Sequence, residues 1–387
     1  MSDFNFFSEK EVKLLFNAKK NKNYIHLHTS SPKLKEIMDI NKLNDILSIP
    51  NLWNSGNFKM VLDRKSISFN QFSTEGLELG YSRISPDPSK VQDYVKKGAS
   101  LVLDDIIYAV KNVKRLAIDL QNITWGKCQA NLYFSMQSHQ AFGPHYDTHD
   151  VFALHCEGEK IWNIYENLED NPINHPIFKP TLEERIKSAG KIKDQVLLKP
   201  GDLLYLPRGQ YHDALASKNG AIHIAFGINY MKPIDVFQSM WENLIINPYL
   251  RSDIKDIKST SDISEINKKI LKEIQNILED KNLLVPLFNN YKNWPYKLSD
   301  YQLDAVVEEG VQYQISKLVK ISKKNDQTLI TNGKEEVAVP KKFEDMTNFS
   351  FEVSNISAKI LYKKFEDIPQ EDVDEFILAM KNMRVFI

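Results

Sequence analysis

The sequence predicts an α+β protein whose centre is a double-stranded β-helix, an antiparallel barrel of the jelly-roll type. Short runs rich in β-branched and aromatic residues follow one another between residues 128 and 231. A His-x-Asp pair, His145 and Asp147, is followed by the pattern Gly-x5-Pro-x-Gly-x2-His from Gly201 to His212. Helical patterns lie on both sides of this region. We therefore expect a barrel with flanking helices, a helical middle domain and a winged-helix-like C-terminal domain.

The region before the barrel is the hardest to assign. Residues 1–95 show a mixed pattern, whereas residues 91–120 place apolar side chains at helical spacing. We expect this second segment to form a helix that packs outside the barrel. Both segments are assigned with the barrel to one catalytic domain, residues 1–232.

The barrel strands are predicted from alternating residue types. In residues 131–136 the polar residues Asn131, Tyr133 and Ser135 share one face of a strand, and apolar residues share the other. A barrel strand with a polar inner lining over a ligand pocket has this pattern. Residues 175–189 are typical of an insertion with a loop and a short helix. Further strands are expected at residues 151–155, 161–165, 195–198, 203–206 and 222–230.

A helical domain is expected at residues 233–300. Its apolar residues form one stripe at helical spacing, with lysine and glutamate on the opposite face. The stripe fits either ordinary helix packing or a dimerisation helix. It consists of Ile263, Ile266, Ile270, Ile274, Ile277 and Leu278.

The last predicted domain covers residues 301–387. Asn332 and Gly333 lie between two short runs of alternating apolar residues and predict a hairpin, and a closing helix is expected from Glu371. This arrangement is typical of a winged-helix-like domain. Acidic residues cluster between Glu371 and Glu375, whereas a surface that binds phosphates should be basic. We therefore expect no direct nucleic-acid binding and interpret the domain as an interaction or structural module.

Composition limits the cellular context. The 387 residues are 42% hydrophobic and 11% aromatic, which allows a substantial core. The formal net charge of -1 gives no global field that would favour nucleic acid or an anionic membrane. Cys128 and Cys156 are the two cysteines, so no disulfide framework is indicated. Because neither a signal-peptide pattern nor a run of transmembrane length is recognisable, we expect a cytoplasmic protein without membrane contact.

His145, Asp147 and His212 are the candidate metal ligands. Side chains at positions i and i+2 of a strand point to the same face, so His145 and Asp147 should face the barrel interior, with Tyr146 outside. His212 would supply the third ligand from another strand. Two histidines and one carboxylate are the ligands of non-haem Fe(II) oxygenases and leave three positions open, enough for a keto acid and dioxygen. A hydrogen-bonded core histidine is the alternative for His145.

Other residues near these motifs have less defined roles. His149 has the same strand parity as His145 and Asp147, so a metal site that includes it is an alternative. His155 and His223 are expected to line the pocket or the core. No role follows from the sequence for Arg208.

Three segments before His212, namely Ala130–Tyr133, Phe142–Phe152 and Glu157–Trp162, carry a family resemblance. Together they resemble the JmjC-type, cupin-fold ribosomal oxygenases. The distal segment Pro200–His212 fits the same family, and the resemblance is specific over residues 100–230. It implies a Fe(II)- and 2-oxoglutarate-dependent dioxygenase, a homodimer that hydroxylates side chains of proteins, with ribosomal proteins as known substrates.

The resemblance also implies roles for single residues. His145, Asp147 and His212 would bind the iron, and Lys160 matches the basic residue that pairs with the distal carboxylate of 2-oxoglutarate. A buried cation opposite a dicarboxylate is physically reasonable, because a desolvated carboxylate needs a charged partner. The alternative for Lys160 is a solvated lysine in a Gly-Glu-Lys turn.

A second group of residues would support the cofactor. Asn131 and Tyr133 match family positions that hydrogen-bond 2-oxoglutarate or the lysine, and Ser135 shares their strand face. Ala225 and Gly227 stand where some members carry small hydroxyl residues. This departure puts any hydrogen bond from that strand in doubt and is consistent with a different substrate.

The predicted function is hydroxylation of a side chain of a protein, such as a ribosomal protein, or of a peptide. The iron and the keto acid carry out the reaction, so no catalytic residue is expected beyond their ligands. One alternative is a hydroxylase that tailors a peptide or a small-molecule natural product, and another is a non-catalytic cupin that binds a ligand or partner. Demethylation by hydroxylation of an N-methyl group is a further alternative. The intact ligand set favours an enzyme.

Overall fold

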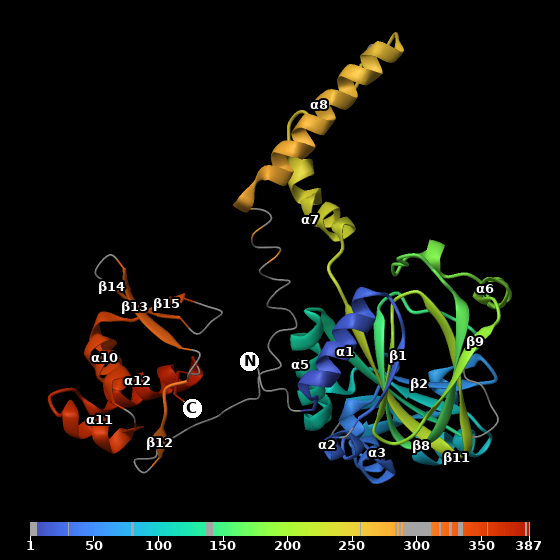
Figure 1. Cartoon of the computed structure of the whole chain (residues 1–387), viewed down its shortest axis with the longest axis horizontal. Coiled ribbons are helices and arrows are strands. Elements are labelled where there is room, and N and C mark those ends of the chain that lie inside the picture. Colours follow the sequence, from blue (N-terminus) through green and yellow to red (C-terminus); the bar gives the residue numbers. More distant parts are fainter. Residues whose placement is uncertain are drawn as a thin grey trace. The chain divides into compact units, whose positions relative to one another are not determined.

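The protein consists of two compact units, Met1–Leu298 and Ser299–Ile387, which we describe separately (Figure 1). The structure is a computed structural model. It describes residues 6–29, 31–78, 81–136, 142–255, 257–282, 285, 288, 311–316, 319–324, 327–331, 336–353, 355–383 and 385–386.

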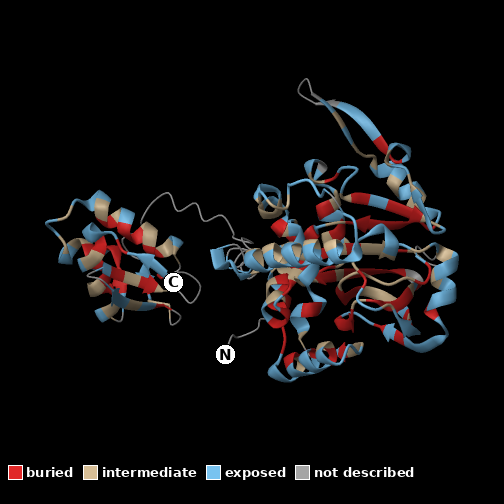
Figure 2. Ribbon diagram, turned by 90° about the horizontal axis from the view of Figure 1, so that it is seen from above, coloured by how far each residue is buried: buried red, intermediate tan, exposed pale blue. Residues whose placement is uncertain are grey.

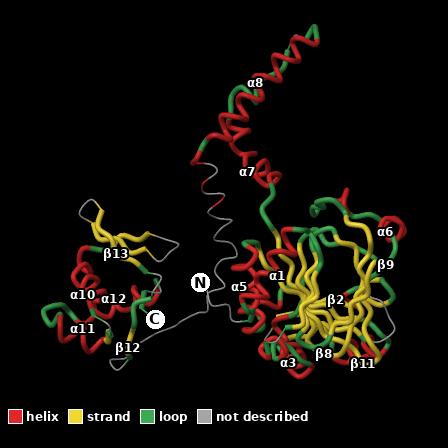
Figure 3. Tube along the Cα trace, in the orientation of Figure 1, coloured by secondary structure: helices red, strands yellow, loops and turns green. Residues whose placement is uncertain are grey.

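An antiparallel nine-stranded sheet forms the centre of the first unit (Figure 3). Its strands follow the order β1-β10-β8-β11-β7-β6-β2-β3, and β9 pairs with β8. Each predicted barrel strand lies within one of them to within one residue at its end. Their bounds are β1 (Ile25–His28), β2 (Phe58–Leu62), β3 (Lys65–Ile67), β6 (Ser100–Leu103), β7 (Lys127–Ser135), β8 (Asp150–Leu168), β9 (Ile192–Leu198), β10 (Asp202–Leu206) and β11 (Gln210–Asn229).

The long strand β8 serves two parts of the barrel. Its first part pairs with β10 and its second part with β9, while β11 pairs with both. The register with β11 shifts between Ala216 and Ala221, beside Gly158. Gly158 has a φ of +71°, and a Cβ at this position would lie 2.1 Å from the carbonyl oxygen of Gly220. Only glycine fits this irregularity. Because the chain continues through it as β8, the two predicted runs 151–155 and 161–165 belong to one strand.

Alternate side chains of the strands face two different cores. On β8, Phe152 and Leu154 pack toward the flanking helices, together with Leu132 of β7. Val151 and Trp162 belong to a separate apolar cluster inside the barrel. Figure 2 shows the buried residues concentrated in the barrel strands and within the second unit. This period-two pattern places the polar face of β7 toward the barrel interior, as the sequence predicts.

Helices cover the sheet from outside. Helix α1 starts with a capping box between Ser8 and Glu11, and α5 packs against β7 and β11 (Figure 1). A separate hairpin consists of β4 (Ser73–Glu78) and β5 (Tyr81–Pro86). The helices before the barrel strands are α1 (Glu9–Lys20), α2 (Pro32–Lys35), α3 (Ile40–Leu47), α4 (Pro88–Lys96) and α5 (Lys111–Thr124), with short 3-10 helices at Pro50–Leu52, Phe69–Gln71 and Ile106–Tyr108.

The predicted continuous helix over residues 91–120 is wrong in its middle. Helix α4 ends at Lys96, and α5 starts only at Lys111. Between them Ser100–Leu103 forms β6, which pairs with both β2 and β7 and is buried along its whole length. A short apolar run fits a buried strand as well as a buried helix, and here the pairing with two neighbouring strands decides.

The remaining helices of the first unit follow the predicted pattern. The insertion forms a short 3-10 helix, Pro176–Phe178, and α6 (Leu182–Ala189). After the barrel come α7 (Pro233–Ile246) and α8 (Thr260–Glu279), which contact each other. The predicted apolar stripe lies on α8, and no residue of this helix is buried. A separate domain at residues 233–300 stays a prediction, because most residues after 282 lie outside the described part of the chain.

The second unit has its own apolar core around Met346, Phe376 and Ile377. The sheet β13-β14-β15 contains the strands of the predicted hairpin, but the turn residues Asn332 and Gly333 lie outside the described residues. The winged-helix-like assignment stays a prediction. The bounds are β12 (Gln312–Tyr313), β13 (Lys320–Lys324), β14 (Gln327–Thr331), β15 (Glu336–Ala338), a 3-10 helix (Lys341–Phe343), α10 (Glu344–Glu352), β16 (Ile356–Ser357), α11 (Ala358–Lys364) and α12 (Gln370–Asn382). Across both units, the described helices are each too short or too polar to cross a bilayer.

Candidate metal and cofactor site

Backbone pairing holds His145 and His212 side by side. Each residue donates its amide N–H to the carbonyl of the other, with N···O distances of 3.0 and 2.8 Å. The amide of Gly209 donates to the carbonyl of Asp147 at 3.0 Å. Gly209 has a φ of +90°, and a Cβ there would lie 2.1 Å from the carbonyl oxygen of Glu169. The glycine of the Pro-x-Gly turn is therefore required for the chain to pass the ligand segment this closely.

His145 and Asp147 do not lie on a regular strand, in contrast to the prediction. His145 forms an isolated bridge, and β8 starts only at Asp150. The expected side-chain directions still hold, because the bridge imposes strand-like alternation on this short segment. Tyr146 points away from the two ligands and donates its hydroxyl to the carbonyl of Phe178 at 3.1 Å.

The candidate ligand atoms of His145, Asp147 and His212 all lie within 4.8 Å of one another. The Nε2 of His212 is 3.6 Å from Oδ2 of Asp147. The Nδ1 atom of His145 contacts the carbonyl of Gly143, and that of His212 contacts the carbonyl of Gln210, both at 2.9 Å. A carbonyl oxygen only accepts, so each Nδ1 carries the proton and each Nε2 presents a lone pair. The protein thus fixes both imidazoles in the tautomer that binds a metal through Nε2.

Electrostatics keeps His212 and Asp147 in their metal-binding forms at neutral pH. Burial and the neighbouring His145 lower the pKa of His212 to about 4, so its imidazole is neutral. Burial would raise the pKa of Asp147, but His149, His212 and His145 together hold it below its ordinary value. His212 is therefore a neutral imidazole and Asp147 a carboxylate, and these are the forms in which the two residues bind a divalent cation.

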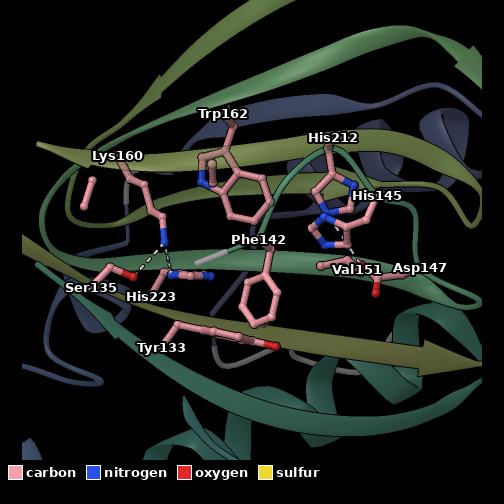
Figure 4. Close-up of a pocket in the computed structure, with 13 residues that line it drawn as sticks. Tyr133, Ser135, Phe142, His145, Asp147, Val151, Lys160, Trp162, His212 and His223 are labelled. Carbon is pink, nitrogen blue, oxygen red and sulfur yellow. Dashed lines mark hydrogen bonds and ion pairs between the residues drawn. The ribbon is translucent and has the colours of Figure 1, made fainter. Parts of the chain in front are cut away.

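A cavity of about 230 Å³ extends from this ligand set into the barrel (Figure 4). The three candidate ligands lie at one end of the view in Figure 4, and Lys160 and Ser135 lie at the other. Aromatic rings lie between the two ends. They belong to Tyr133, Phe142, Trp162 and His223.

Lys160 is a buried cation at the inner end of the cavity. Only 5% of the residue is exposed, and its Nζ donates to Oγ of Ser135 and Nδ1 of His223, both at 3.3 Å. Burial lowers the pKa of Lys160 to about 7. Within the described chain both of its hydrogen-bond partners are neutral groups, because burial and Lys160 itself hold the pKa of His223 well below its ordinary value. The alternative of a solvated turn lysine is wrong.

Trp162 adds a donor without a partner among the described residues to the same end of the cavity. It follows Lys160 by two residues on β8, so both side chains point inward (Figure 4). Its Nε1 is buried and has no hydrogen-bond partner among the described residues. A buried cation and a buried N–H without an acceptor are costly unless an anionic acceptor occupies the cavity. The donor set therefore fits a carboxylate group here, together with a divalent metal at the other end.

The strand faces explain which predicted residues reach the cavity. Tyr133 and Ser135 line it, and the ring of Tyr133 stacks on His223 with a centroid distance of 4.7 Å. Asn131 does not line it, although it lies on the same face, and its Oδ1 accepts the amide N–H of Asp105 at 3.1 Å. We infer that Asn131 supports the cavity wall.

The ring of His149 occupies the space beside Gly227. A Cβ on Gly227 would lie 2.3 Å from this ring, so the absence of a side chain there makes room for His149. His149 is not part of the ligand group at His145, Asp147 and His212. Position 227 therefore lacks the hydroxyl that some family members carry there, and the His149 ring fills the space that a side chain at this position would take.

Trp162 was not assigned a role from the sequence. Its ring packs on His212 at a centroid distance of 5.5 Å and meets His223 edge-on at 5.4 Å. Strand parity with Lys160 is the signal that indicates an inward direction. Phe142 lines the cavity with its ring centroid 5.9 Å from that of His145, and it lies on an irregular segment where no periodicity could have placed it.

Comparison with known proteins gives matches for this region. The JmjC domain family matches residues 107–235. A bifunctional lysine-specific demethylase and histidyl-hydroxylase NO66 of Drosophila persimilis is 27% identical over 223 residues, which is 51% of this chain and 30% of that protein. The protein of the same name from Dictyostelium discoideum is 34% identical over 139 residues, which is 35% of this chain and 26% of that protein. The chain thus spans about a quarter to a third of the length of these curated relatives.

Solved structures share the fold along the whole chain. The X-ray structure of E. coli ycfD matches with a TM-score of 0.57 at 14% identity and covers 100% of both chains. YcfD, a ribosomal oxygenase from Escherichia coli in complex with cobalt and succinic acid, matches with a TM-score of 0.54 at 15% identity and covers 100% of this chain and 99% of its own. At this identity the likeness shows the fold alone. The JmjC domain match over residues 107–235 contains the whole cavity, in agreement with the sequence resemblance.

Proposed function

We propose that the chain is an Fe(II)- and 2-oxoglutarate-dependent oxygenase that hydroxylates a side chain of a protein or peptide. One observation carries the proposal: a single cavity joins a two-histidine, one-carboxylate ligand set to a buried lysine without an acidic partner among the described residues. Two histidines and a carboxylate with open positions are typical of non-haem Fe(II) oxygenases. A simple metal-storage or structural site has no need of the lysine.

Each residue of the cavity has a role in this proposal. His145, Asp147 and His212 would hold the iron, and Lys160 with Nε1 of Trp162 would hold the distal carboxylate of 2-oxoglutarate. When bound, the iron and the keto acid supply the oxidising power for attack on a C–H bond. The rings of Tyr133, Trp162 and His223 would keep water away from the cofactor, which strengthens its interaction with the lysine.

A protein side chain is the substrate that the relatives favour. The NO66 proteins are named histidyl-hydroxylases, and the YcfD structure is described as a ribosomal oxygenase. A histidine of a ribosomal protein is therefore the first candidate. The NO66 name also includes lysine demethylation, which is the second candidate. Tailoring of a peptide or small-molecule natural product and non-catalytic binding are less well supported, because the ligand set and the cofactor lysine are both present.

We also propose that the chain forms a homodimer through its middle helices. On α7, Ile234, Phe237, Trp241 and Ile245 are exposed at helical spacing on one face. Large exposed apolar patches on a folded protein mark interaction surfaces. A symmetric pairing with a second copy would cover this face together with the stripe on α8.

A cytoplasmic location without membrane contact remains part of the proposal. Cys128 and Cys156 are both buried free thiols, which is the usual state in a reducing compartment. For the second unit we propose a role in protein interaction rather than in nucleic-acid binding. Lys342 is already paired with two acidic residues of α12, Asp372 and Glu375.

The metal assignment predicts different effects for two histidines. His145→Ala should abolish the absorption band that Fe(II) and 2-oxoglutarate form together under anaerobic conditions, because two remaining ligands hold Fe(II) poorly. His149→Ala is the matched control and should keep the band, since His149 lies outside the ligand group. Loss of the band in His149→Ala with retention in His145→Ala would show that the metal site was misassigned.

The activity itself is tested by product formation. The chain is incubated with Fe(II), 2-oxoglutarate, O2 and ribosomal proteins or their histidine-containing peptides, and succinate is measured. We expect succinate together with a mass increase of one oxygen atom on a peptide, and neither with Asp147→Ala. Formaldehyde release from methylated lysine peptides would favour demethylation instead. Absence of succinate with every peptide, despite an intact anaerobic band, would leave the non-catalytic reading as the better one.

The cofactor role of Lys160 predicts a pH-dependent affinity. Lys160→Ala should raise the Kd for 2-oxoglutarate about 30-fold or more, because a buried charge pair is lost. In the wild type, a bound carboxylate favours the charged lysine and raises its pKa, so binding above pH 7 takes up a proton. The affinity should be flat below pH 7 and fall by up to about tenfold per pH unit above it.

Two variants test whether Lys160 is the group that causes this pH dependence. Lys160→Arg keeps its charge at every pH of the experiment, so its pH slope above 7 should disappear even if its affinity is lower. Lys160→Ala should show no slope either. Binding can be followed with Mn(II) in place of Fe(II) under turnover-free conditions. A wild-type slope that persists in both variants would assign the titration to a different group.

The dimer proposal predicts that a single charged substitution on the apolar face of α7 dissociates the dimer. Trp241 is 61% exposed, so Trp241→Glu should leave the fold intact while placing a charge in the apolar face. Analytical ultracentrifugation of the full chain should give a dimer for the wild type and a monomer for Trp241→Glu. Ile186→Glu on α6, where Ile186 is 50% exposed, is the control and should remain dimeric. A monomeric wild type at micromolar concentration would contradict the proposal.

A further inference from the structure

A second group of two histidines and one aspartate lies where β1 joins the barrel. His26 and His28 belong to β1, and Asp202 is the first residue of β10. The Nε2 of His26 lies 3.1 Å from Oδ2 of Asp202, and the Nδ1 of His28 lies 3.0 Å from Oδ1. One ligand atom from each residue lies within 4.8 Å of the others. This group shares no residue with the cavity that holds Lys160.

Strand geometry produces this group directly. His26 and His28 are two positions apart on one strand, so their side chains point to the same face. His28 is the Cα partner of Asp202 in the antiparallel pairing of β1 and β10, which brings the third side chain to that face. The carboxylate is oriented further by the amide of Lys199, which donates to its Oδ2 at 3.0 Å. All three donors are thus positioned by backbone structure.

The side chains are close enough to share one metal ion. With metal–ligand bonds of about 2.0–2.1 Å, ligand atoms around tetrahedral zinc lie roughly 3.3–3.4 Å apart. Here His26 lies 3.1 Å from Oδ2 and His28 lies 3.0 Å from Oδ1, and one ligand atom from each of the three residues lies within 4.8 Å of the others, so side-chain rotations would bring all three onto one ion. Each imidazole would present its lone pair in place of the N–H that it now directs at the carboxylate, which is a change of tautomer.

The charge and exposure of the group also suit a cation. Burial would raise the pKa of Asp202, but the Lys199 amide and the two histidines hold it below its ordinary value, so the residue is anionic at neutral pH. The Asp202 and His26 side chains are 11% and 19% exposed, whereas that of His28 is 75% exposed. The group is therefore anchored on one side and open to solvent on the other, which gives a metal ion a route in and leaves a position for water.

We propose that His26, His28 and Asp202 form a second divalent metal site, selective for a borderline ion such as Zn²⁺, that ties the edge strand β1 to β10. Imidazole and carboxylate together favour zinc over the hard cations calcium and magnesium. Leu204, the partner of His26 on β10, belongs to the apolar cluster inside the barrel. A metal at this position would link β1 to β10 at the end of the inner face of the barrel, and it would not contact the candidate iron ligands. The proposal does not rest on the proposed oxygenase activity.

The test is a cycle of metal titrations on the full chain after chelator treatment, with Zn²⁺ as the probe. Isothermal titration calorimetry should give two equivalents for the wild type, one for His28→Ala, one for His145→Ala and none for the double variant. His175→Ala is the matched control, because His175 is an exposed histidine outside both groups, and it should keep two equivalents. Losing one ligand should weaken the second site more than about tenfold.

A further variant separates metal binding from a purely structural role of the hydrogen bonds. His28→Gln keeps an amide donor for Asp202 but lacks a good zinc ligand, so it should lose one equivalent like His28→Ala. Zn²⁺ should raise the Tm of His145→Ala and leave that of His145→Ala/His28→Ala unchanged. Two equivalents retained in His28→Ala, or a wild type whose bound zinc is all lost with His145→Ala, would overturn the proposal.

Discussion

Two backbone hydrogen bonds between His145 and His212 hold the candidate metal site together. They bring an irregular segment before β8 against the start of β11, and the side chains of both histidines then face one point. The carbonyls of Gly143 and Gln210 set both rings in one tautomer. The positive φ of Gly209 allows the close passage of the chain. Ligand geometry here follows from main-chain pairing, which side-chain substitutions alter little, and this makes the site rigid before any metal arrives.

The polar groups at the other end of the cavity lower the stability of the empty barrel. A lysine with a pKa lowered to about 7 and an indole N–H without a partner in the described chain both destabilise the empty barrel. A carboxylate ligand would relieve both at once, so folding and cofactor binding are thermodynamically coupled. Strands β8 and β11 can tolerate this cost because their opposite faces bury a large apolar core against the helices. The donors in the cavity wall therefore favour the binding of an acidic ligand.

Much of this arrangement could be predicted from the sequence, because alternation along a strand is a local signal. Tyr133, Ser135 and Lys160 line the cavity, as strand parity and the resemblance predict, and the strands of the barrel followed from β-rich runs. Failures occurred where long-range pairing decides. Residues 100–103 fit the helical pattern of the sequence, but in the structure they pair with two neighbouring strands. His145 lies on a bridge rather than a strand. Asn131 has the right face but is held by the amide of Asp105, a contact that no pattern reveals.

A set of two histidines and one aspartate occurs twice among the described residues of this unit, and the surroundings of the two sets determine the chemistry that each can support. The set at His145, Asp147 and His212 opens toward a cavity with aromatic walls and a counter-charge for an acidic ligand. The set at His26, His28 and Asp202 opens toward solvent through the exposed His28. A metal in the first set would bind a ligand inside an aromatic-walled cavity, whereas a metal in the second would link two strands and keep a position open to water. The ligand residues alone therefore do not determine the function of each set; the residues around them do.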